Sequence, residues 1–89
     1  MFSTTQKQIF NNAKALYAAN DFDGLIALSL GLEPETIKAL DELIDIDYDK
    51  EHAALKEMNL STHQAAMQYD ELCNKVQTIY AAFNGVLNV

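Results

Sequence analysis

The 89-residue chain is predicted to be an all-α protein, a compact bundle of four to five helices with a long C-terminal helix. Apolar side chains recur every three or four positions along most of the chain, which is the spacing of one helix face. Only three Gly and one Pro interrupt this pattern, whereas a β-sandwich or barrel needs many turn residues. At this length we expect a single helical domain, residues 1–89.

The first predicted helix runs from about Thr4 to Ala19 and follows hydroxyl side chains that can cap its N-terminus. The residues expected on its buried face are Phe2, Ile9, Ala13 and Leu16. Asn20 can end this helix in a left-handed conformation, and Asp21 can cap the next one. The second helix is short and very apolar, from about Phe22 to Leu30, and Gly31 is a natural stop.

The third helix is expected to open at Pro34, because Pro is tolerated in the first helical turn. Its predicted buried face consists of Ile37, Leu40, Leu43 and Ile44. Residues 45–49 alternate Asp with apolar or aromatic side chains, and Asp has weak helix propensity. We therefore expect a break at residues 45–49, followed by a fourth helix capped by Asp49. That helix spans about Lys50 to Met58, with inward side chains at Ala54, Leu55 and Met58.

The last segment carries the clearest helix signal. Ser61 and Gln64 have the spacing of a capping box. An apolar stripe with alternating steps of four and three follows, at Ala65, Tyr69, Leu72, Val76, Ile79, Phe83 and Val86. The stripe predicts a helix from Thr62 to roughly Asn84, where Asn84 and Gly85 suit a C-terminal stop. We expect this helix and the first one to be the two long members of the fold.

The charge of the chain points to a protein partner with a basic surface. The chain has thirteen acidic residues, six Lys and no Arg, so its formal net charge is −7. Arg-free, acidic chains are poor candidates for direct nucleic-acid binding. They suit a basic protein surface, including one that normally holds nucleic acid, as in the mimics that phages and mobile elements encode. The candidate partner-binding face, with Tyr48 as an aromatic anchor, is Asp41, Glu42, Asp45, Asp47, Tyr48, Asp49 and Glu51.

Two other interpretations of this acidic segment remain. It can be a solvated face that keeps a small protein soluble. Asp45, Asp47 and Asp49 also match the first three ligands of an EF-hand loop. That loop needs Gly at its sixth position and Glu at its twelfth, where this chain has Lys50 and Lys56. The pattern therefore argues against calcium binding.

Residues typical of catalysis or metal binding are sparse. Cys73 is the sole cysteine, and His52 and His63 lack the close paired spacing of a zinc site. Cys73 lies within the apolar stripe of the last helix, which favours a packing role. The chain has no Gly-rich phosphate loop and no nucleophile elbow. We expect a protein that is not an enzyme and that needs no metal or cofactor.

The alternative function is a structural, self-assembling subunit that forms a homo-oligomer through its C-terminal helix. The residues expected at that contact are Val76, Ile79, Phe83, Val86 and Leu87, and Val89 extends the apolar tail. The N-terminus shows no basic stretch followed by an apolar run, and no apolar run has the length of a membrane span. The single cysteine allows no internal disulfide. These features predict a cytoplasmic protein with no membrane partner.

Overall fold

The computed structural model describes residues 2–87, which form four helices and contain no strand. The helices are α1 (Thr4–Ala18), α2 (Phe22–Ser29), α3 (Pro34–Glu57) and α4 (Thr62–Phe83). The all-α fold class predicted from the apolar periodicity is confirmed. Among these four helices, none is long and apolar enough to cross a membrane.

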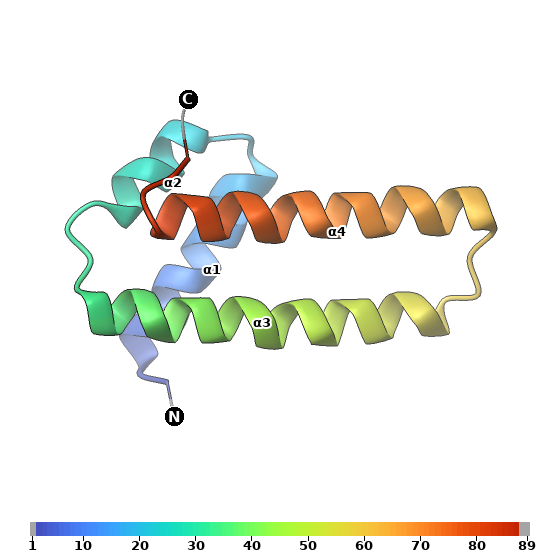
Figure 1. Cartoon of the computed structure of the whole chain (residues 1–89), viewed down its shortest axis with the longest axis horizontal. Coiled ribbons are helices and arrows are strands. Elements are labelled where there is room, and N and C mark those ends of the chain that lie inside the picture. The colour runs from blue at the N-terminus through green and yellow to red at the C-terminus, as the bar shows by residue number, and fades with distance from the viewer. Residues whose placement is uncertain (1, 88–89) are drawn as a thin grey trace.

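The two longest helices, α3 and α4, form an antiparallel hairpin along the long dimension of the molecule (Figure 1). α1 crosses behind this hairpin, and α2 packs beside α1 and the C-terminal part of α4. α1 and α2 therefore cover only one end of the hairpin. The other end, which carries the turn at residues 58–61, extends beyond them. We call this part the hairpin extension.

The predicted break at residues 45–49 is wrong, because α3 continues through them as one helix of 24 residues. The helical register buries Ile44 and turns the carboxylate of Asp47 toward Lys14 and Lys75. Packing and ion pairing thus outweigh the weak helix propensity of Asp. As a consequence the long helices are α3 and α4, whereas the sequence pattern indicated the first helix and the last.

Asp49, predicted to cap a separate fourth helix, lies inside α3, but the other predicted capping signals are found at helix ends. The Ser61 hydroxyl accepts a hydrogen bond from the Gln64 backbone N–H, and the Gln64 side chain accepts one from the Ser61 N–H. Asn20 has a φ of 56°, the left-handed conformation expected after α1. The Asp21 side chain then accepts a hydrogen bond from the Gly24 N–H and caps α2. These turns reverse the chain so that α1 and α2 can pack against each other.

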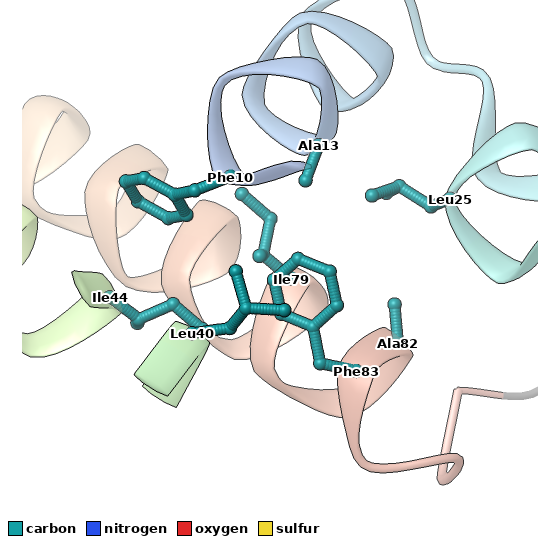
Figure 2. Packing of buried hydrophobic residues seen from close by; sticks show 8 residues of the cluster. All are labelled: Phe10, Ala13, Leu25, Leu40, Ile44, Ile79, Ala82 and Phe83. Atoms are coloured by element: carbon teal, nitrogen blue, oxygen red, sulfur yellow. The ribbon is translucent and has the colours of Figure 1, made fainter. Parts of the chain in front are cut away.

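The hydrophobic core lies at the covered end of the hairpin and draws on all four helices (Figure 2). Its buried members are Phe10, Ala13, Leu25, Leu40, Ile44, Ile79, Ala82 and Phe83. The hairpin extension is packed less deeply. Met58 and Ala54, both predicted to face inward, are exposed, and Met58 retains 58% of its accessible surface. Ala54 lies in the last turn of α3, and Met58 follows the end of that helix.

Candidate interaction surfaces

The predicted acidic face divides between two sides of α3. Side chains three or four positions apart share one face of a helix, whereas those two apart point in different directions. Glu42, Asp45 and Asp49 are exposed on the outer side of α3. Asp47 and Glu51 are half-buried and face the other helices, where they meet lysines. A continuous helix therefore separates carboxylates that a loop could have gathered together.

The inner carboxylates belong to an ion-pair cluster that joins three helices. Lys14 Nζ of α1 lies 3.2 Å from Asp47 Oδ1, and Lys75 Nζ of α4 lies 3.5 Å from Asp47 Oδ2. Lys75 also contacts the Glu51 carboxylate. The side chain of Asp47 keeps only 16% of its accessible surface. These two carboxylates are largely neutralised within the chain and contribute little to an electronegative surface.

Asp41 is tied to the C-terminal end of α4. Its Oδ1 accepts a hydrogen bond of 3.0 Å from Asn84 Nδ2. Burial raises the pKa of the Asp41 carboxyl above its usual value, the hydrogen bond from Asn84 opposes the shift, and the charge of Asp45 adds to it. Asp41 therefore contributes to the contact between α3 and α4 at the covered end of the hairpin.

Tyr48 does not stand free among the acidic side chains. It is half-buried, and its ring lies 5.6 Å from the ring of His52, measured between centroids. His52 in turn lies 5.0 Å from the ring of Tyr69 on α4. The three rings therefore form a ladder across the hairpin. His52, the middle member of the ladder, is half-buried in α3.

The exposed carboxylates of the predicted acidic face lie close together on α3. The outer ridge is defined as Glu42, Asp45, Ile46 and Asp49. Each of its members lies three or four positions from another, so the four side chains are neighbours on the helix surface. Ile46 is 53% exposed and provides an apolar centre. Among the described residues no ion pair involves the ridge carboxylates, and the exposed Lys38 and Lys50 flank them.

Most of the residues predicted for self-association lie inside the single chain. Ile79 and Phe83 are buried in the core, and Val76 and Leu87 pack against it. Val86 is 64% exposed. Val89 lies outside the described residues. The apolar stripe of α4 is thus largely covered by the other helices of the same chain.

A groove lies between α1 and the two helices of the hairpin, on the opposite side of α3 from the outer ridge. Its volume is about 560 Å³. The residues that line this hairpin groove are Lys14, Tyr17, Ala18, Glu51, Ala54, Leu55, Gln68, Glu71, Leu72 and Lys75. Burial raises the pKa of the Tyr17 hydroxyl, Glu71 adds to the shift and Lys75 opposes it. The groove combines an apolar floor with a charged rim.

No protein-family model, curated protein or solved structure matches the chain. Within residues 2–87 no three His, Cys, Asp or Glu side chains gather in a group that could hold a metal ion. Cys73, predicted to be a small core residue, is half-buried, with a free thiol.

The hairpin groove was not predicted from the sequence, since Ala54, Leu55 and Leu72 lie on faces that the periodicity assigned to the core. One signal could have indicated it. Lys14 and Lys75 each fall beside apolar positions of their helices, next to Ala13 and Val76. A lysine at the edge of an apolar stripe needs either a carboxylate partner or an opening to solvent. Here both conditions are met.

Proposed function

We propose that this chain is a small interaction protein, built as a compact helical bundle, that binds a basic protein surface through the outer ridge. The observation that carries the proposal is the exposed position of Glu42, Asp45 and Asp49 on one face of an unbroken helix. Ile46 lies among them with half of its surface in solvent. The ridge spans about 10 Å along the helix, since each residue rises about 1.5 Å.

Charge and apolar surface have separate roles in this proposal. The net charge of −7 attracts a basic partner and accelerates association. Burial of Ile46 against the partner, with the carboxylates paired around it, slows dissociation. One form of the proposal is a nucleic-acid mimic that occupies the binding surface of a nucleic-acid-binding protein. The role is regulatory, inhibitory or adaptor-like, without catalysis, and we place it in the cytoplasm.

Affinity capture from the native host at low and high salt tests this function. The ridge variant combines Glu42→Gln, Asp45→Asn and Asp49→Asn. Its matched control combines three other exposed carboxylates, as Asp23→Asn, Glu57→Gln and Asp70→Asn. Each set removes three charges and changes the net charge from −7 to −4. Any difference between them therefore reports the position of the charges.

We expect wild type and the control to retain a partner that high salt releases, and the ridge variant to lose it. A partner of the nucleic-acid-binding class would also be displaced by nucleic acid. Equal retention by the two variants, or retention that salt does not affect, would contradict the proposal.

A self-assembling subunit is the second candidate function. It is favoured by the exposed apolar side chains on the C-terminal part of the chain, where Tyr80 and Val86 retain 48% and 64% of their surfaces. Exposed apolar side chains are typical of contacts between copies. Sedimentation at high micromolar concentration tests it: an oligomer that Val86→Asp dissociates supports this candidate, and a monomer excludes it.

A further inference from the structure

The hairpin groove lies where α1 meets the two helices of the hairpin. α1 stops at Ala18, while α3 and α4 run on to the turn at residues 58–61 (Figure 1). Leu55 and Leu72 on the floor are joined by the exposed Ala54 and Ala18, whose small side chains leave room above them. Two antiparallel helices with a third beside them form the kind of groove that a further helix occupies in a helical bundle.

The charges of the rim select the occupant. Lys14 and Lys75 form ion pairs with Asp47 and Glu51, so the two positive charges are offset by two negative ones. Among the ion pairs of the described residues none involves Glu71, which is exposed on α4 one turn before Lys75. The charge left over at the groove is therefore negative, as is the charge of the whole chain. A second copy would bring the same excess of negative charge, which opposes self-association here.

We propose that the hairpin groove binds an amphipathic, basic helix of a partner protein. The apolar residues of the partner helix, spaced three and four apart, contact Tyr17, Leu55 and Leu72. A Lys or Arg beside these apolar residues pairs with Glu71. The groove and the outer ridge lie on opposite sides of α3. This second surface goes beyond the function proposed above and does not depend on it.

The first test uses a defined probe, a fluorescent synthetic peptide of about 18 residues, five helical turns. The peptide has Leu at helical spacing and Lys on the flanking positions. A scrambled peptide of the same composition, which lacks the apolar stripe, reports binding by charge alone. The binding of each peptide to the full chain is measured by fluorescence anisotropy. Ala54→Trp fills the groove, and Ala53→Trp places the same side chain on a neighbouring exposed position of α3 that does not line it.

We expect Ala54→Trp to weaken binding about tenfold relative to Ala53→Trp, and the scrambled peptide to bind weakly to both. Equal affinities for the two tryptophan variants would overturn the proposal, as would equal binding of the two peptides. Circular dichroism checks that both variants remain helical. Should Ala54→Trp not fold, the charge variants described next decide the question without a change of packing.

A second pair of variants separates the rim from the net charge. Glu71→Lys reverses a groove carboxylate, and Asp70→Lys reverses its exposed neighbour, which does not line the groove. Both raise the net charge by the same amount. We expect Glu71→Lys, but not Asp70→Lys, to weaken binding of the peptide severalfold. Equal losses would show that charge steering alone explains the binding, and the groove proposal would fail.

Two further results bear on the occupant. Amide chemical-shift changes on adding the peptide should centre on Ala18, Ala54 and Leu72. Changes centred on the outer ridge would overturn the groove proposal while leaving the proposed function intact. Sedimentation covers the remaining occupant, since a dimer that Ala54→Trp dissociates and Ala53→Trp does not would assign the groove to a second copy.

Discussion

Replacing Asp47 by Asn should destabilise the fold far more than the same change at Asp45, two positions away. Within residues 2–87, Asp47 is the one carboxylate that meets cations from both α1 and α4, at 3.2 Å and 3.5 Å. Without its charge Lys14 loses its partner, while Lys75 keeps Glu51. The two ammonium groups then remain close together without the negative charge between them.

The magnitude follows from the depth of the site. An exposed ion pair contributes less than about 1 kcal/mol, and a partly desolvated hydrogen bond to a charged group about 1.5–3 kcal/mol. Asp47, with 16% of its side chain exposed, lies between these cases, and Asn keeps one neutral acceptor. We expect a loss of about 1–2 kcal/mol in the free energy of unfolding, or about 5–15 °C in Tm for a domain of this size. Asp45→Asn should change the free energy by less than about 0.5 kcal/mol.

Urea denaturation followed by circular dichroism measures both variants. A double-mutant cycle with Lys14→Met isolates the contact between α1 and α3, and its coupling energy should fall as salt is raised. Equal stabilities of Asp47→Asn and Asp45→Asn would refute the reasoning, because they would show that the carboxylate of Asp47 is as solvated as that of Asp45.

Three further outcomes follow from the structure. Because the pKa of the Asp41 carboxyl is raised in the folded protein, its contribution to stability is present at low pH and is lost as the pH rises through that pKa. Asp41→Asn, whose amide oxygen can still accept a hydrogen bond from Asn84, should therefore raise Tm at neutral pH but not at a pH of about 3. Ile46→Pro should cost about 3 kcal/mol or more in a continuous α3, whereas Ile46→Ala at the same exposed position should cost little; equal effects in thermal melts would place a loop there. Leu40→Ala removes a fully buried side chain and should lower the free energy of unfolding by about 2–5 kcal/mol, and a loss below about 1 kcal/mol in urea would contradict the assigned core.

The helices were predictable where side chains signal locally. The capping pair Ser61 and Gln64, the left-handed Asn20 and the stripe of α4 depend on residues close in sequence, and each appears in the structure as expected. Helical spacing also identified Leu40 and Ile44 as buried. These signals establish the fold class because each of them is satisfied within a few residues of the chain.

Residues 45–49 could not be assigned from local signals. Their alternating Asp residues resemble a break, and only contacts with α1 and α4 show why the helix continues. Lys14 and Lys75 lie 33 and 28 positions from Asp47 along the chain. For the same reason the acidic residues looked like one face, although the register turns Asp47 away from Asp45. Long-range ion pairs and the groove between three helices are tertiary features that periodicity does not encode.

Backbone NMR of residues 34–57 tests the central claim most directly, because the unbroken course of α3 determines which carboxylates face a partner. We predict helical Cα shifts and sequential amide contacts without interruption from Pro34 to Glu57. Slow amide exchange should extend across residues 45–49. Coil-like shifts and rapid exchange confined to residues 45–49 would contradict the claim. A loop there would break the ion pairs of Asp47 with its lysines, and the side chains of the outer ridge would no longer share one helix face.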